Sequence, residues 1–293
     1  VLIGLSLLLL FSLAFSVCIG IAGGNIRILA DAIMHPVSAS DIGKIMIDMR
    51  IPRALAACLT GAAFALAGAV MQGLTRNPLA DAGLLGINAG AGLFVALSVA
   101  LLPSASSIIT ILSAFVGASF AVILVYGFGA GKRKAESFRL ILAGAAISAL
   151  LTAMSQAVSI AFGVTKVLSF WSAGSLSGIT WQSLGLIVPF IIVAGIIGFA
   201  LSGRLSALAL GEDSAIGLGI NVQLVRLIGI LVVLLLAGAS VSLVGGISFL
   251  RLIVPHTARF LVGGDYRRIM PVSALLGGVV LVLADVAART VNA

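Results

Sequence analysis

The side chains that usually carry catalysis or bind metals are few in this sequence and lie far apart. The two histidines, His35 and His256, are in different halves of the chain, and the two cysteines, Cys18 and Cys58, lie within apolar runs. The sequence contains no HExxH, CxxC or Walker A pattern, so neither a metal site nor a nucleotide-binding loop is expected. We therefore predict no enzyme, and energy for any transport must come from an ion gradient or from another subunit.

The charged residues stand out because they make up only 9% of the 293 residues. Asp81, Asp265 and Asp285 lie near the ends of apolar runs, whereas ion-coupled carriers usually place carboxylates at mid-membrane. Arg251 lies inside an apolar segment and is our candidate for a pathway residue that meets an anionic substrate. The favoured alternative is an arginine satisfied by helix-end carbonyls near the outer surface.

The elements that must position these residues are membrane helices. Hydrophobic residues make up 61% of the chain, and nine acidic with seventeen basic residues cannot cover a soluble surface of this size. This composition excludes a soluble enzyme, a nucleic-acid-binding domain and a disordered chain. Apolar runs of about twenty residues favour helices over a β-barrel, and the 35 glycines suit close helix packing.

Nine apolar runs predict an all-α bundle that crosses the membrane many times. The first is interpreted as a spanning helix whose true start is missing, because it lacks the basic region of a signal peptide. The eighth is short and contains Pro255, so we expect it to cross only partly. The runs fall at about 1–22, 54–73, 83–102, 107–130, 139–163, 185–202, 225–244, 247–262 and 271–288.

Basic residues predict the orientation. The Lys132–Lys134 triplet, Arg204 and the Arg267–Arg268 pair fall on one side when the spans alternate, and this side should be the cytoplasm. The outer side then also carries basic residues near helix ends, which either meet an acidic partner or form local pairs such as Asp285 with Arg289. These outer residues are Arg27, Lys44, Arg50, Arg53 and Arg289.

Two segments are predicted to lie along the membrane surface instead of crossing it. Residues 204–223 contain the Glu212–Asp213 pair between glycines, and we expect one or two short helices beneath the membrane. Residues 163–182 carry both tryptophans, which favours a short helix at the outer interface.

The chain also matches itself at an offset of 177 residues. Gly61, Gly68 and Pro78, for example, match Gly238, Gly245 and Pro255. The two copies cross the membrane in opposite directions, and such inverted repeats are typical of transporters.

Three long motifs resemble the signatures of the FecCD/BtuC-type permeases, in the right order. The first is RIPRALAACLTGAAFALAGAVMQGLTRNPLADAGLLGINAGAG over Arg50–Gly92. The others are LALGEDSAIGLGINV over Leu208–Val222 and the segment from Gly245 to Arg289. These permeases are membrane subunits of ABC importers for ferric siderophores, heme and cobalamin, and the resemblance covers essentially the whole chain.

The resemblance implies a single permease domain over 1–293 with ten helices, the tenth beyond Ala293. It implies a bacterial inner-membrane importer, most often for ferric siderophores, with heme or cobalamin as alternatives. Its partners would be a second permease (a different one favoured over a second copy), two ATPases that use ATP and Mg, an outer substrate-binding protein and membrane lipid. The chain itself would bind no cofactor, metal or nucleic acid. A gradient-driven secondary transporter is the alternative outside this class.

The resemblance also implies residue roles. The 204–223 segment would couple to the ATPase, and the outer arginines would pair with acidic residues of the binding protein. Arg251 departs from the family, which commonly has Gly there. The implied sets are Leu210, Gly211, Glu212, Asp213, Ala215 and Gly219 for coupling; Arg50, Arg53 and Arg289 for docking; and Asn77, Leu79, Ser137 and Phe138 for the cytoplasmic gate.

Overall fold

The computed structural model describes residues 1–19, 23, 25–35, 40–129 and 136–291, without the side chains of 136–138. Every regular element in these ranges is helical, which confirms the predicted all-α fold. In chain order the elements are α1 (Leu2–Cys18), α2 (Ile26–Met34), α3 (Asp41–Ile45), η1 (Met46–Arg50), α4 (Ile51–Thr75), η2 (Ala82–Leu85), α5 (Ile87–Leu101), α6 (Ser107–Gly129), α7 (Glu136–Ala161), α8 (Thr165–Ala173), α9 (Trp181–Ala209), α10 (Glu212–Gly217), α11 (Val222–Val233), η3 (Leu234–Gly238), α12 (Ala239–Val244), α13 (Leu250–Val262) and α14 (Tyr266–Val291).

Six helical segments of the described chain are long and apolar enough to cross a membrane. Helices α1 and α5 are apolar but shorter, and α13, with Pro255 inside it, has only 13 residues. Each predicted apolar run therefore contains a helix, and the chain is a multi-pass membrane protein. The six segments are Asp41–Thr75, Ser107–Gly129, Arg139–Ala161, Trp181–Ala209, Val222–Val244 and Tyr266–Val291.

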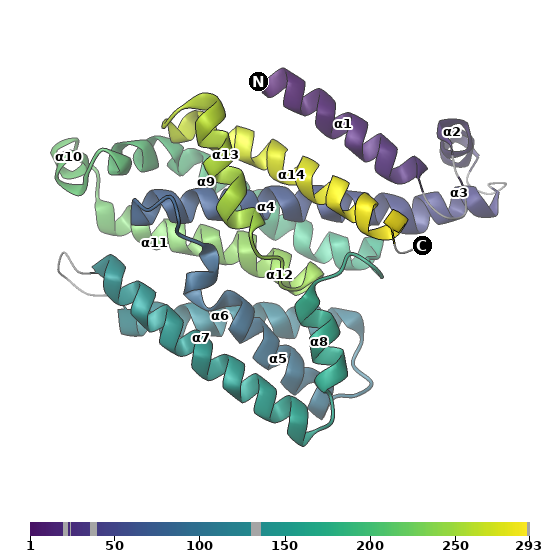
Figure 1. Cartoon of the computed structure of the whole chain (residues 1–293), viewed down its shortest axis with the longest axis horizontal. Coiled ribbons are helices and arrows are strands. Elements are labelled where there is room, and N and C mark those ends of the chain that lie inside the picture. The colour runs from purple at the N-terminus through teal and green to yellow at the C-terminus, as the bar shows by residue number, and fades with distance from the viewer. Residues whose placement is uncertain (20–22, 24, 36–39, 130–135, 292–293) are drawn as a thin grey trace.

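Helix α4 runs through the middle of the larger helix group (Figure 1), where it packs against α14, α9, α13 and α11. In its span, 78% of the apolar window is buried. A Cβ added at Gly61 would collide with the backbone carbonyl of Gly277 on α14, and a Cβ at Gly277 would collide with that of Gly61. Because lipid offers little hydrophobic drive for helix pairing, this close approach of small residues is what holds α4 to α14.

Helices α5, α6 and α7 form a second group beside the first (Figure 1). Gly90 on α5 and Gly117 on α6 make the same reciprocal contact as the α4–α14 glycines. Helix α7 is the least covered of the long helices, since only 22% of its apolar window is buried. Much of the α7 surface is therefore free to face another molecule or an open space.

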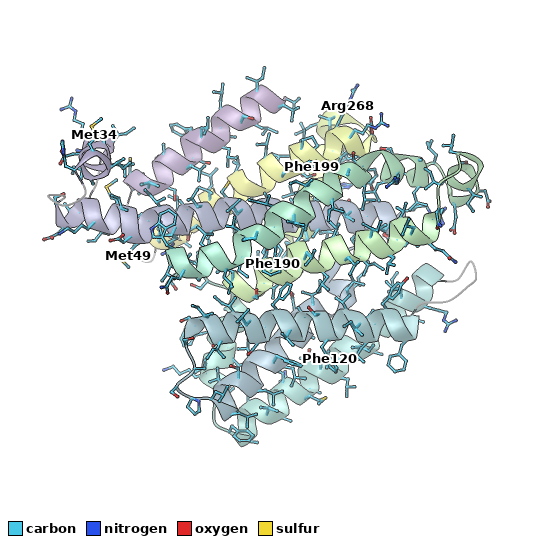
Figure 2. All side chains as sticks on the ribbon, turned by 180° about the vertical axis from the view of Figure 1, so that it is seen from behind. Met34, Met49, Phe120, Phe190, Phe199 and Arg268 are labelled. Atoms are coloured by element: carbon cyan, nitrogen blue, oxygen red, sulfur yellow. The ribbon has the colours of Figure 1, made fainter. Side chains whose placement is uncertain are left out.

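Large apolar side chains point outward from the long helices α6 and α9 (Figure 2). Phe120 on α6 is 40% exposed, and Phe190 and Phe199 on α9 are 39% and 41% exposed. Arg268, in contrast, lies at one end of the bundle. Exposed aromatic groups along helices of this length suit contact with lipid chains.

The two ends of the bundle carry different short helices (Figure 1). One end, called here the α10 end, carries α10, and the opposite end, called the α3 end, carries α2 and α3. The short helix predicted within 163–182 is observed as α8. Trp181 begins α9, and its indole Nε1 donates a hydrogen bond to the carbonyl of Ile47 at 3.1 Å, which fixes the start of α9 near η1.

The span predicted at 54–73 begins earlier than expected. Helix α3, the π-helical turn η1 and α4 form one continuous helical segment, so Arg50 and Arg53 lie within it and not in a preceding loop. These two arginines lie where the apolar run begins, but the helix does not begin there. Backbone hydrogen bonds continue from α3 into α4 through the wider π turn η1.

The predicted inverted repeat is seen in the directions of α4 and α11. Thr75 at the end of α4 and Arg226 near the start of α11 line one small cavity, and the two helices pack together, so they run in opposite directions. At the 177-residue offset, Gly68 inside α4 is matched with Gly245, which ends α12 at φ 76°. The two copies therefore differ in where their helices end.

Candidate functional site

The 204–223 segment forms a sharp turn and one short helix at the α10 end. Helix α9 continues to Ala209, so the first part of this segment belongs to a spanning helix. Gly211 then adopts φ 126°, a conformation that L side chains rarely adopt, and α10 follows directly. Ala215 is fully buried, and Gly219 at φ 77° redirects the chain toward α11.

The two acidic residues of α10 have different surroundings. Glu212 accepts a hydrogen bond from Arg226 Nη2 at 3.0 Å, and Arg76 Nη2 lies 3.9 Å from the same carboxylate. Asp213 is exposed. Glu212 therefore ties α10 to α11 and to the end of α4, while Asp213 remains available to another molecule.

Three apolar side chains on and around α10 are left uncovered. Leu210 is 75% exposed, Ile216 57% and Leu218 66%. They lie beside the exposed Asp213, at a bundle end where a lipid-facing role is not expected. Apolar groups that cluster on a short polar element mark a surface for protein contact.

The predicted gate residues Asn77 and Leu79 lie in the loop that follows α4. Arg76 ends α4 in a left-handed conformation with φ 52°. The side-chain Oδ1 of Asn77 accepts a hydrogen bond from the backbone N–H of Leu79 at 2.9 Å, and Leu79 is 72% exposed. The side chains of Ser137 and Phe138, assigned to the other half of the gate, lie outside the described residues.

Arg251 lies in the interior of this chain, beside a carboxylate and an aromatic ring. The residue is fully buried, its Nε lies 3.1 Å from Asp81 Oδ1, and its guanidinium is 5.3 Å from the centre of the Phe64 ring. It therefore meets a carboxylate instead of helix-end carbonyls, and it is not among the described residues that line the two cavities reported below. The loop after α4 folds back toward α13, which brings Asp81 of the first motif to Arg251 of the third.

The three outer arginines converge on one region at the α3 end. Arg53 donates to both carboxylate oxygens of Asp285, at 2.7 to 3.1 Å, and Arg289 Nε lies 3.6 Å from the same carboxylate. Arg289 also donates to Ser16, and Arg50 donates to the carbonyls of Val17 and Cys18. The local pair of Asp285 with Arg289 is thus present, and Arg53 is the most exposed of the three, with 26% of its side chain accessible.

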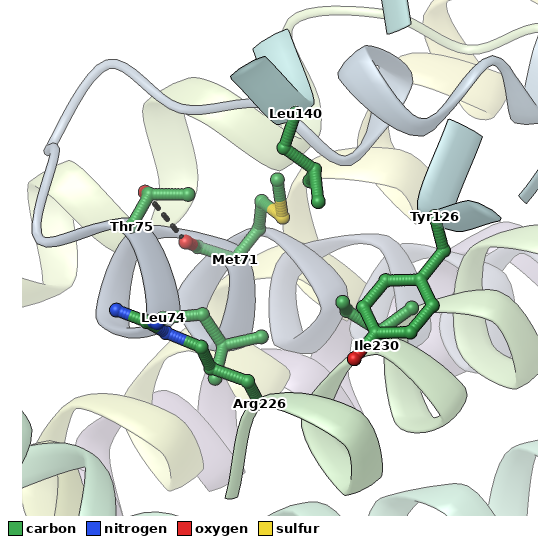
Figure 3. Close-up of a pocket in the computed structure, with 7 residues that line it drawn as sticks. All are labelled: Met71, Leu74, Thr75, Tyr126, Leu140, Arg226 and Ile230. Atoms are coloured by element: carbon green, nitrogen blue, oxygen red, sulfur yellow. Dashed lines mark hydrogen bonds between the residues drawn. The ribbon is translucent and has the colours of Figure 1, made fainter. Parts of the chain in front are cut away.

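A small cavity lies between α4, α6, α7 and α11 toward the α10 end (Figure 3). Its volume is about 30 Å³, the space of roughly one water molecule, so it cannot hold a chelate. Arg226, which binds Glu212, lines this cavity together with Thr75, whose hydroxyl donates to the carbonyl of Met71 at 2.8 Å. The cavity therefore marks where the α10 contact, the end of α4 and the start of α7 meet.

A much larger cleft of about 490 Å³ lies between α5, α7 and α8. Thr152, Ser155, Gln156 and Ser159 from α7 form part of its wall, at the spacing that places side chains on one helix face. None of its described lining residues carries a charge. The wall is thus uncharged, but it is richer in hydroxyl and amide groups than a simple apolar pathway.

Sequence reasoning missed three features of these sites. Arg226 was assigned only to the cytoplasmic side and not to Glu212, because a pair fourteen residues apart across a turn leaves no periodic signal. The Asp81–Arg251 pair joins two motifs that are distant in sequence. The polar face of α7 could have been recognised from polar residues at i, i+3, i+4 and i+7, beginning at Thr152. It was overlooked because the rest of this run is apolar.

Comparison with known proteins gives a family match over nearly the whole chain. The model of the FecCD transport family matches residues 8–293. The chain is 41% identical over 283 residues to the iron(3+)-hydroxamate import system permease protein FhuB of Bacillus subtilis, covering 95% of this chain and 73% of that protein. It is 39% identical over 290 residues to the ferric enterobactin transport system permease protein FepD of Escherichia coli, covering 98% and 86%.

Two further matches extend the comparison. The vitamin B12 import system permease protein BtuC of Yersinia enterocolitica is 37% identical over 293 residues, covering 98% of this chain and 83% of that protein. Among solved structures, a metal-chelate-type ABC transporter in an inward-facing conformation superposes with a TM-score of 0.87 at 28% identity. That match covers 99% of this chain and 90% of the solved one.

Proposed function

This chain belongs to the FecCD transport family, and from this we propose that it is a permease subunit of an ABC importer for ferric siderophores. Six long apolar helices in the described part of the chain supply a membrane domain, and relatives named for iron–hydroxamate and ferric enterobactin transport support iron chelates as cargo. The permease contributes a shaped pathway and carries out no bond chemistry.

The observation that carries the proposal is the uncovered surface around α10. A helix of six residues exposes Asp213, Ile216 and the flanking Leu210 and Leu218, while Glu212 ties it to α11. Such a projection suits a groove on a partner ATPase, which would bind and hydrolyse ATP with Mg²⁺. Because only Leu210 and Gly211 separate α9 from α10, a push on α10 reaches a spanning helix directly.

We infer the orientation from charge, and the family supports the bacterial cytoplasmic membrane as the location. Arg76, Arg204, Arg226, Arg267 and Arg268 lie near the α10 end of their helices. An excess of arginine is typical of the cytoplasmic side, so we place the α10 end in the cytoplasm and the α3 end outside. ATP-driven movement at one end would then alternate access to a pathway that opens at the other.

The arginines at the α3 end would dock an outer substrate-binding protein through its acidic residues. Arg53 is the member of this set that a partner can reach, while Arg50 and Arg289 are largely committed to carbonyls and Asp285. Docking would therefore use Arg53 directly and the other two as neighbouring positive charge.

A second permease would complete the pathway. Helix α7, with little of its surface covered by this chain, is the face available for that partner, and two different permeases are favoured over two copies. The importer would then consist of two permeases, two ATPases and the binding protein.

The substrate assignment is tested by uptake in cells that lack other iron importers. We expect expression with the partner genes to restore accumulation of radiolabelled iron given as a ferric siderophore. Restoration of cobalamin or heme uptake without iron uptake would overturn the siderophore assignment, with cobalamin supported by the vitamin B12 relative.

A further inference from the structure

Three exposed arginines lie together where α9 ends and α14 begins, and we call them the α9–α14 arginine patch. Arg204 lies on the last turns of α9, and Arg267 and Arg268 lie in the first turn of α14, at the α10 end of the bundle (Figure 2). No carboxylate of the described residues forms an ion pair with these three side chains. Other arginines of the described chain do pair with carboxylates, namely Arg53, Arg76, Arg226, Arg251 and Arg289.

Hydrogen bonds fix this part of α9 against the start of α14. Ser206 Oγ donates to Asp265 Oδ1 at 2.7 Å and accepts from the backbone N–H of Tyr266 at 2.8 Å. A Cβ added at Gly203 would lie 3.0 Å from Arg267 Nη2, so the absence of a side chain there lets this guanidinium rest against α9. The patch is therefore held on two packed helices and not on a loose loop.

The patch is positive although a carboxylate lies beside it. Asp265 Oδ1 accepts hydrogen bonds from Ser206 Oγ and from the backbone N–H of Arg267 at 3.0 Å. These bonds lower the pKa of Asp265, so it is ionised at neutral pH and offsets part of the arginine charge. Three guanidinium groups still exceed one carboxylate. Guanidinium groups match the oxygens of a phosphate group, which makes a phosphate the ligand that this chemistry favours.

The patch lies at the level where phospholipid headgroups meet the protein. Arg204 follows the apolar run 185–202 of α9, and Arg268 precedes the apolar run 271–288 of α14. Toward the middle of the membrane, Ile192, Ile196 and Phe199 are exposed on α9. Their spacing places them on the same helix face as Gly203, which contacts Arg267 of the patch. An apolar stripe thus leads along α9 directly to the arginines.

We propose that the α9–α14 arginine patch binds an anionic phospholipid from the membrane leaflet at the α10 end. The lipid phosphate would accept hydrogen bonds from Arg204 and Arg267, with Arg268 as further positive charge, and the acyl chains would pack along the stripe on α9. A zwitterionic headgroup also carries a cation, which the arginines repel. The adjoining stripe favours a lipid over an acidic surface of a soluble partner, which does not reach into the membrane. This inference goes beyond the importer function and requires only that the chain is inserted in a membrane.

Titration of lipid into the detergent-solubilised importer, with bound lipids counted by native mass spectrometry, tests the proposal. The probes are phosphatidylglycerol, which is anionic, and phosphatidylcholine, which is zwitterionic. We expect tighter binding of phosphatidylglycerol, and Arg204→Gln combined with Arg267→Gln should weaken that binding about tenfold, because each arginine near the headgroup contributes attraction. The matched control, Arg27→Gln combined with Lys44→Gln, removes two exposed charges at the α3 end and should have no such effect.

A second pair of variants separates charge from folding. Arg204→Lys combined with Arg267→Lys keeps both charges and should retain most of the affinity for phosphatidylglycerol. A loss as large as in the glutamine variant would show that charge does not bind the lipid and would overturn the proposal. Equal affinity of the unchanged importer for the two lipids would do the same, as would equal weakening by the control at the α3 end.

The same spectra count the partner subunits that stay bound to the permease. Loss of the ATPase subunits in the glutamine variant, with unchanged affinity for phosphatidylglycerol, would assign the patch to a protein contact and overturn the lipid site. Retained ATPase subunits together with weakened phosphatidylglycerol binding is the result that the proposal predicts.

Discussion

At the scale of single residues, the Asp81–Arg251 pair is the feature with the largest structural consequence. It joins the loop after α4, which carries the gate residues Asn77 and Leu79, to α13. A buried guanidinium without its carboxylate is strongly unfavourable, whereas removal of both charges can be nearly neutral. The pair therefore makes the position of the gate loop depend on α13.

Asp81→Asn should lower the stability of the purified protein by about 3 kcal/mol, because it leaves Arg251 buried and unpaired. Arg251→Met alone should cost less, since Asp81 keeps partial access to water with 32% of its side chain exposed. Thermal unfolding in detergent measures both variants. The double variant should recover most of the loss, and strictly additive losses would show that the two side chains do not interact.

The sequence was least informative at this scale. It singled out Arg251, but it could not identify Asp81 as the partner because the two lie in different motifs and the pairing depends on how a loop folds back. The outer arginines were likewise found by their charge, while the shared contact of Arg53 and Arg289 with Asp285 required the packing of α4 against α14.

At the scale of helices, glycine contacts fix how the spans pack. Gly61→Ala would place a methyl group against the backbone of Gly277, which cannot move away as a flexible side chain could. We expect a loss of about 1–3 kcal/mol, the usual cost of overpacking, measured by thermal unfolding in detergent. Gly185→Ala on α9 is the matched control, because nothing lies within 4 Å of its added Cβ. Equal stability of the two variants would contradict the close α4–α14 contact.

Helix α10 should transmit ATP hydrolysis through its exposed face. Asp213→Lys should reduce association with the ATPase subunits or chelate-stimulated hydrolysis several-fold, without loss of folding, because Asp213 is exposed while Glu212 ties α10 to α11. Asp41→Lys, an exposed acidic residue at the α3 end, is the control. Normal ATPase association together with normal coupled hydrolysis in Asp213→Lys would remove the coupling role.

Helix positions were predictable because long apolar runs leave few alternatives in a membrane. Each predicted run contains a helix, and the short helix within 163–182 was expected from its tryptophans. The helix boundaries were not predictable where a helix continues past the end of its apolar run. Arg50 and Arg53 lie inside a continuous helix, and α9 extends to Ala209, well beyond its apolar run.

At the scale of the whole molecule, the two ends of the bundle are chemically different. One end exposes an apolar and acidic surface around α10, and the other carries Arg50 together with Arg53 and Arg289, the last two at Asp285. Such polarity is what an importer needs if an ATPase binds at one face and a substrate carrier at the other. Membrane insertion and family were readable from composition and motifs, but the partners at each end are proposals from surface chemistry.

Arg53→Gln should weaken docking of the binding protein about tenfold at low salt, with a smaller effect at high salt where charge attraction is screened. Asp285→Asn is the matched control, since it breaks the same internal pair but keeps the arginine. It should leave docking unchanged or strengthen it. Surface plasmon resonance on nanodiscs measures both, and equal weakening by the two variants would assign Arg53 to structure instead of docking.

The energy source for uptake tests the central claim most directly. The purified importer is placed in liposomes with the binding protein and a labelled ferric siderophore, and accumulation is followed with ATP, without ATP and with an uncoupler. An ABC permease predicts accumulation that requires ATP and the ATPase subunits and persists with the uncoupler. Accumulation by this chain without the ATPase subunits, abolished by the uncoupler, would contradict the account and identify a gradient-driven transporter.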